Sequence, residues 1–391
     1  MDQELQKKGW ACADYNMPTD TLGDLVKKKD ELLHISSEEV KSAFSISFSG
    51  FDADKVEYIE LSKAITRAFL RYDPLTRLLA QSIWKELKDK FKLSSEIKYS
   101  GLPYPIIHFP LDTSESGRRH KDNLEYVKHF YTTWTPLNDC LHKPLSLFEN
   151  THKKDNFFLR QLRIRVPFIN KIVLSSKKEL KPDIHLGEFF VWHGTTDHAG
   201  LLNHSGKTTV SIVVSFTSSP IMNGPSLPTS DIEKYVFEKL NIDTNNVVKK
   251  IVNAFGMVKS ASVEDFKSLA ELREKLNLQI KEWNFSPDEA KRFAFTCALW
   301  AQRLEDKRNV TLFYFYAFFS FGDNFNTLNK CLTYAIDKFA VSDVMDLINY
   351  ILVKFGSEQA EFEIKNTINQ SGQKEKYSDL KYPQGLKLLK P

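Results

Sequence analysis

The hydrophobic pattern of the chain changes its period once, and this change limits the folds open to it. From about 100 to 218, short apolar or alternating runs such as "GEFFVWH" and "TTVSIVVSF" are broken by turn residues. Such runs, rich in β-branched and aromatic residues, predict an antiparallel barrel or sandwich. From about 228 the period becomes helical, after a loop at 217–230 that is rich in Pro, Gly and Ser. The chain is therefore expected to carry a β domain followed by a helical one.

Several helices can be placed by their capping residues. In "SPDEAKRFAFTCALWAQRL", Ser286 is the expected N-cap, Pro287 the first helical residue, and Glu289 completes a capping box. An amphipathic helix is expected at 73–91, and "SSEEVKSAF" (36–44) is expected to begin another helix with its own capping box. The apolar stripe of the first of these helices comprises Ala290, Phe293, Ala294, Cys297, Trp300, Ala301 and Leu304.

Composition excludes several classes of protein. The net charge of +4 is small, and no basic run is interleaved with aromatic residues, so a nucleic-acid partner is not expected. The four cysteines form no CxxC pair, the N-terminus has no apolar core of a signal peptide, and the longest apolar run (310–322) is too short to span a membrane. We expect a cytoplasmic protein without a membrane partner.

All ten histidines lie at or before His204, and the last 187 residues contain none. In "GRRHKDN", His120 and Asp122 are two residues apart, so on a strand both side chains point to the same face. Two histidines and one carboxylate form the facial triad of non-haem Fe(II) oxygenases. A solvated loop with an ion pair is the alternative interpretation of this tripeptide.

The stretch "GEFFVWHGTTDHAGLLNHSGKTTVSIVVSF" (187–216) supplies a third histidine at a recognisable spacing. His198 comes eleven residues after Gly187, Asn203 follows five residues later, and the final strand ends in Phe216. With "YPIIHFP", "FYTTWTPLNDC" and "PLSLFENTH" upstream, about 65–220 resembles the phytanoyl-CoA dioxygenase-like (PhyH) family of Fe(II)/2-oxoglutarate-dependent oxygenases. The competing histidines are His193, which could line the cavity or support the site, and His204, which is expected in an exposed turn.

The resemblance implies a fold, a cofactor and a set of ligands. It implies an α+β chain with a double-stranded β-helix (jelly-roll, cupin-like) core, N-terminal helices and a C-terminal all-helical domain. His120, Asp122 and His198 would be the catalytic metal ligands for Fe(II), with 2-oxoglutarate as cosubstrate. The corresponding domain division is 1–64 for the N-terminal helical or extended region, 65–220 for the oxygenase-like domain, 228–368 for the helical domain and 369–391 for a polar tail.

One departure from the family pattern concerns the cosubstrate. The family has an arginine two residues before a small residue on the last strand, where it binds the far carboxylate of 2-oxoglutarate. Ser211 is the expected small residue here, and Thr209 stands at the arginine position. Lys207 is the nearest cation and would share their face if the strand extended that far. We therefore expect Lys207, Thr209 and Ser211 to bind the cosubstrate, with the arginines of "LRQLRIRV" as a second source of positive charge: Arg160, Arg163 and Arg165.

The expected function is oxidation of a small molecule by O2, as hydroxylation or a related reaction through a ferryl species. One alternative is a cupin-like metal enzyme that does not use 2-oxoglutarate, which the missing arginine favours. Another is a non-catalytic jelly-roll module that binds a small molecule. The helical domain could mediate a homodimer.

Overall fold

The structure is a computed structural model, and it describes residues 3–47, 55–94, 97–99, 103–111, 119–122, 129–138, 143–152, 178–218, 243–259, 262, 265–304, 312, 325–355 and 358–377. The chain divides into two compact units. The first comprises 1–29, 70–220 and 226–239, and the second comprises 30–69, 221–225 and 240–391. Both units are therefore discontinuous in sequence.

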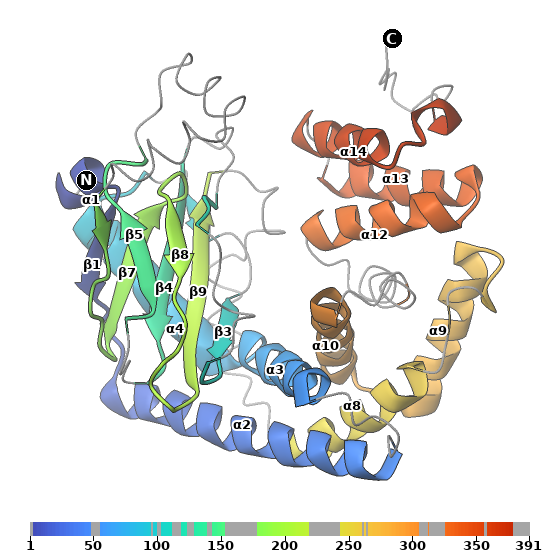
Figure 1. The fold of residues 1–391 in the computed structure, drawn as a ribbon, viewed down its shortest axis with the longest axis horizontal. Coiled ribbons are helices and arrows are strands. Elements are labelled where there is room, and N and C mark those ends of the chain that lie inside the picture. Colours follow the sequence, from blue (N-terminus) through green and yellow to red (C-terminus); the bar gives the residue numbers. More distant parts are fainter. Residues whose placement is uncertain are drawn as a thin grey trace. The chain divides into compact units, whose positions relative to one another are not determined.

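The first unit contains a large antiparallel sheet, drawn as the broad set of arrows in Figure 1. Its strands follow the order β1-β7-β4-β9-β2, and β3 also pairs with β9. The edge strand β1 comes from the N-terminus and pairs with β7, which lies about 180 residues later in the chain. The bounds are β1 Trp10–Asp14, β2 Lys98–Tyr99, β3 Tyr104–His108, β4 Phe130–Pro136, β7 Glu188–His193 and β9 Thr209–Thr217.

A smaller antiparallel sheet has the order β6-β5-β8, with β5 at Leu145–Phe148, β6 at Glu179–Leu180 and β8 at His198–Gly200. One apolar cluster joins side chains from both sheets, so the two sheets enclose a common core. Its buried members are Trp134, Leu145, Leu147, Ile184, Phe190 and Trp192, and Trp10, Ile106 and Val213 pack against them.

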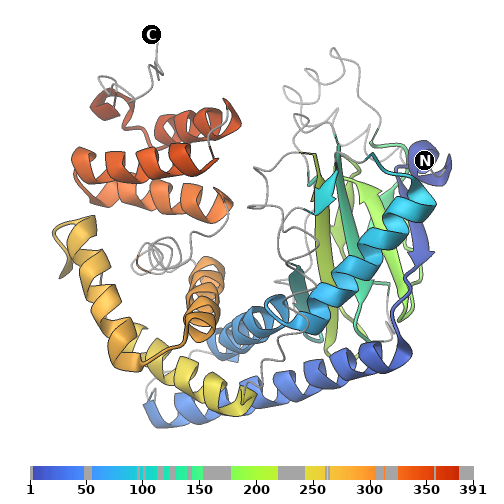
Figure 2. The ribbon, with the colours of Figure 1, turned by 180° about the vertical axis from the view of Figure 1, so that it is seen from behind.

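The other face of the large sheet is covered by helix α4 (Pro74–Phe91), which lies across the strands in Figure 2. Trp84 of the helix stacks on Phe216 with ring centroids 5.1 Å apart, and Phe91 meets Phe189 edge-on. Asp73 caps the helix by accepting a hydrogen bond from the amide of Leu75. Burying these aromatic surfaces on α4 stabilises the sheet from its outer side.

In the described part of 243–377 every regular element is a helix. The aromatic core of this unit includes an edge-on contact between Phe255 and Trp300, and the buried Arg292 donates a hydrogen bond to the carbonyl of Phe69. The bounds are α8 Thr244–Lys259, α9 Leu269–Trp283, α10 Pro287–Leu304, α12 Phe325–Lys338, α13 Val341–Phe355, α14 Glu358–Gln370 and the 3-10 turn η2 Lys374–Tyr377. The unit also takes most of α2 (Thr19–Ser47) and α3 (Lys55–Arg71), while α1 (Gln3–Lys8) belongs to the first unit.

These elements confirm the predicted mixture of helices with antiparallel sheet. The capping box of α10 is present, because Glu289 accepts from the Ser286 amide and Ser286 accepts from the Glu289 amide. The capping box expected at 36–44 is wrong. Ser36 lies inside α2, where its hydroxyl is buried and meets the hydroxyls of two α3 residues, Ser62 and Thr66.

Three sequence predictions fall wholly or mostly on residues outside the described set: the loop at 217–230, of which only the first two residues are described, the arginines at 160–165 and most of the apolar run at 310–322. Among the helices that the structure describes, none combines the length and apolar character needed to cross a membrane. The four-part domain division stays a prediction.

Candidate metal centre

His120 and His198 are held together by the backbone. The two residues form an isolated antiparallel bridge in which each amide donates to the other's carbonyl, at 2.9 and 3.0 Å. On its other side His198 pairs with Leu147 of β5. Because residues directly opposite one another in paired strands share a face, both imidazoles project toward the core that the two sheets enclose.

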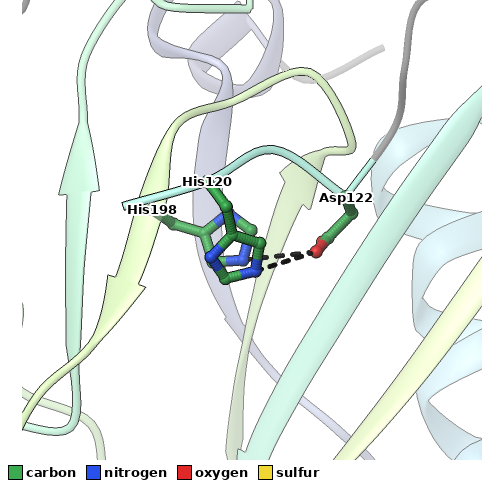
Figure 3. A group of neighbouring side chains, drawn as sticks. All are labelled: His120, Asp122 and His198. Carbon is green, nitrogen blue, oxygen red and sulfur yellow. Dashed lines mark ion pairs between the residues drawn. The ribbon is translucent and has the colours of Figure 1, made fainter. Parts of the chain in front are cut away.

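Asp122 follows His120 by two residues and carries the third side chain to the same place. Its Oδ1 lies 3.6 Å from Nε2 of His120 and 3.4 Å from Nε2 of His198. Figure 3 shows both imidazole rings directed at this carboxylate. One potential ligand atom from each of the three residues lies within 4.8 Å of the others, which is close enough to converge on one ion.

The three side chains differ in their access to water. The side chain of His198 is 6% exposed and that of Asp122 is 21% exposed, whereas that of His120 is 51% exposed. The centre is therefore deep on the His198 side and open on the His120 side.

The hydrogen-bond partners of the cluster suit a metal site. Nδ1 of His198 lies 3.1 Å from the carbonyl of Thr196, which leaves Nε2 as the ring nitrogen that faces Asp122. Burial alone would raise the pKa of Asp122. Contacts with His120 and His198 and the hydroxyl of Thr132 outweigh that effect and hold the pKa of this carboxyl well below its usual range. Asp122 is thus an anion at neutral pH.

An ion pair supports the two histidine segments from outside the cluster. Arg119 and Asp197 immediately precede His120 and His198, and their side chains meet at 3.0 Å. The guanidinium also lies over the ring of Phe148, 3.4 Å from its centroid. The segments are thus joined by side chains as well as by the backbone bridge.

The three residues expected to bind the cosubstrate have different positions. Thr209 and Ser211 are buried on β9, and their Cα partners on β3 are His108 and Ile106. Lys207 is exposed in the bend before the strand, which begins only at Thr209. The condition under which Lys207 would share the face of Thr209 and Ser211 is therefore not met, and its role stays a prediction.

The other residues singled out in the 187–216 stretch lie outside the three-residue cluster. His193 lies against Tyr131 and Thr195, and it is not a member of the three-residue cluster. His204 is exposed, as expected. The buried Asn203 donates to the carbonyls of His108 and Lys207, so it ties the turn before β9 to β3.

Sequence reasoning missed two residues that contact the centre. Thr132 of β4 and Trp192 of β7 both donate hydrogen bonds to Oδ2 of Asp122. Both residues lie in runs that were predicted to be strands, "FYTTWTP" and "GEFFVWH". The sequence pattern of a strand does not show which residue of another segment its side chains contact.

No protein-family model matches the chain, and no curated protein matches it. Among solved structures it is similar to AviO1 from Streptomyces viridochromogenes Tue57, with 12% identity over 55% of this chain and 92% of that chain and a TM-score of 0.36. The non-heme alpha ketoglutarate dependent epimerase SnoN from nogalamycin biosynthesis has 11% identity over 55% of this chain and 79% of its own, with a TM-score of 0.33. EctD from S. alaskensis, solved with 2-oxoglutarate and 5-hydroxyectoine, has 13% identity over 55% of this chain and 73% of its own, with a TM-score of 0.30. Scores this low establish neither the fold nor the activity of this chain.

Proposed function

We propose that this protein is a non-haem Fe(II)/2-oxoglutarate-dependent oxygenase that oxidises a small molecule, with His120, Asp122 and His198 as its metal ligands. The observation that carries the proposal is the convergence of these three ligand atoms within 4.8 Å. The donor set of two imidazoles and one carboxylate is the one that suits iron with open coordination positions. A jelly-roll core for the first unit and a scaffold role for the helical half, including a homodimer contact, belong to the same proposal.

The residues around the cluster fit a metal ion. The anionic Asp122 offsets the charge of a dication, and His198 directs Nε2 at the cluster while its other nitrogen faces a carbonyl. When bound, Fe(II) together with 2-oxoglutarate supplies the oxidising chemistry for which the protein has no side chain of its own.

The protein's own residues orient the reactants and exclude water. The apolar cluster that contains Trp192 and Leu147 lies behind the centre and keeps water from that side. The exposed edge of His120 marks the side from which a substrate would enter. Thr209 and Ser211 offer hydroxyl donors to a cosubstrate, and the Ser211 hydroxyl is buried without a hydrogen-bond partner among the described residues.

The test is turnover of 2-oxoglutarate by the full chain loaded with Fe(II). We expect succinate to form with consumption of O2. His198→Ala should lower both metal affinity and turnover by more than about a hundredfold, which exceeds the loss seen when a group that only hydrogen-bonds to a ligand is removed. His204→Ala, at an exposed histidine six residues later, is the matched control and should behave as wild type. Absence of metal binding by the wild-type protein would contradict the proposal and leave the non-catalytic binding module as the better explanation.

A second candidate is a cupin-like metal enzyme that does not use 2-oxoglutarate. The observation in its favour is that β9 carries neither arginine nor lysine, although a buried carboxylate needs a cation. Lys207→Ala separates the two candidates when the binding of Fe(II) and of 2-oxoglutarate are measured in parallel. A large rise in the 2-oxoglutarate KM with unchanged iron affinity would identify Lys207 as the anchor. Wild-type protein that binds iron but not 2-oxoglutarate would establish the second candidate.

A further inference from the structure

The two carboxylate oxygens of Asp122 have different surroundings. Oδ1 faces the Nε2 atoms of His120 and His198. Oδ2 points away from them and accepts two hydrogen bonds, from Oγ1 of Thr132 at 2.7 Å and from Nε1 of Trp192 at 2.9 Å. Both distances are within the normal range for strong hydrogen bonds to an anion.

The two donors belong to a rigid part of the sheet. Thr132 and Trp192 are Cα partners on the adjacent strands β4 and β7, so their side chains leave the sheet side by side. Both residues are buried, at 3% and 2% exposure, and Trp192 is also packed in the apolar cluster between the sheets. The indole of Trp192 cannot turn away from Asp122 without disturbing that packing.

We propose that Thr132 and Trp192 are positioning residues that restrict Asp122 to binding the metal through Oδ1 alone. The inference rests on the proposed metal centre. A carboxylate can bind a metal through one oxygen or through both, and the two hydrogen bonds that Oδ2 accepts compete with a metal for its lone pairs. One-oxygen binding leaves a further coordination position open for cosubstrate or O2.

The same contacts raise the affinity of the centre. Groups that hydrogen-bond to metal ligands orient them, and their removal commonly weakens metal binding by about 10- to 100-fold. Here the hydrogen bonds from Thr132 and Trp192 also satisfy a partly buried carboxylate, so that the carboxylate is already aligned before an ion binds.

Co²⁺ is the probe for the test, because its visible absorption reports both occupancy and coordination number. The variants are Thr132→Val and Trp192→Phe, which remove one donor each while keeping most of the volume. Each should weaken Co²⁺ binding by about 10- to 100-fold. The absorption spectrum per bound ion should also change, because a carboxylate free to bind through both oxygens alters the set of atoms around the ion. Thr132→Ser keeps the hydroxyl and should restore near wild-type binding.

Two matched controls come from the opposite face of the sheet. Thr133 is the next residue of β4 and donates to the carbonyl of Val214, and Trp84 stacks on Phe216. Thr133→Val and Trp84→Phe therefore make the same chemical changes without touching Asp122, and both should retain wild-type Co²⁺ affinity and absorption.

The possible results separate the inference from the function on which it rests. If wild-type protein binds Co²⁺ no better than His198→Ala, the metal centre itself is wrong. If wild type binds and His198→Ala does not, but Thr132→Val and Trp192→Phe match their controls, the metal centre stands and the positioning role is overturned. Should Trp192→Phe fail to fold, the comparison of valine with serine at 132 still decides the question.

Discussion

The two faces of the large sheet differ sharply in chemistry, although alternate residues of the same strands form them. On the outer face Val210, Ile212, Val214 and Phe216 of β9 are buried, and Phe216 packs on Trp84 of α4. On the inner face Thr132 and Trp192 hold Asp122. Thus the outer face serves stability alone, whereas the inner face carries both the apolar core and the donors that hold Asp122. A substitution on the outer face should therefore affect stability without affecting metal affinity.

The largest effect that we expect on the outer face comes from Phe216→Ala. This substitution removes a fully buried ring and should lower the free energy of unfolding by about 3–5 kcal/mol. Urea unfolding measures this loss, and Co²⁺ titration of the folded variant should give an affinity within about threefold of wild type, a difference of less than 1 kcal/mol. If metal affinity fell in step with stability, the two faces would not be independent.

A smaller, pH-dependent effect on stability is expected from His193 of β7, whose ring meets that of Tyr131 of β4 edge-on. Burial, aided by the charges of His152, His129 and Lys121, lowers the pKa of His193 to about 4. Its Nδ1 also accepts a hydrogen bond from the amide of Thr195, which a protonated nitrogen could not do.

Because the unfolded chain would bind this proton near pH 6.5, the stability contributed by neutral His193 is fully present above about pH 6.5. It should be lost as the pH falls from 6.5 to about 4, by at most about 3 kcal/mol. His193→Gln should flatten this part of the stability curve, and His204→Gln, an exposed control, should not. A curve unchanged by His193→Gln would mean that other groups cause the acid destabilisation.

The smallest effect is expected at the Arg119–Asp197 ion pair, where β8 meets the His120 segment. It tests whether stability and metal affinity are also separable next to the proposed ligands. Arg119 and Asp197 lie next to the proposed ligands but pair with each other instead. Arg119→Gln leaves the 9% exposed Asp197 carboxylate without its cation, and should lower stability by about 1–2 kcal/mol. Metal affinity should fall by less than about tenfold (1.4 kcal/mol), because the backbone bridge remains.

Lys143→Gln breaks an exposed ion pair in the same unit and is the control, for which no measurable loss is expected. A loss of metal binding by Arg119→Gln as severe as that of His198→Ala would show that the ion pair, rather than the bridge, aligns the two histidines.

The sequence alone determined those features whose physical cause is local. The run "TTVSIVVSF" formed the strand β9 as predicted, and side chains on a strand alternate with a period of two, so Thr209 and Ser211 lie on the face opposite Val210 and Ile212. The Ser286 capping box formed as predicted, since its donors and acceptors lie three residues apart. The His120-x-Asp122 pair and the spacing of His198 from Gly187 also indicated which three side chains to examine together.

Tertiary structure decided what depends on partners distant in the chain. The same type of motif failed at Ser36, where packing against α3 continues the helix and gives the hydroxyl buried partners. The pairing of β1 with β7 and the bridge between His120 and His198 join segments separated by about 180 and 78 residues, and no local pattern specifies such a register. The hydrogen bonds from Thr132 and Trp192 to Asp122 exist only because two neighbouring strands place an alcohol and an indole side by side.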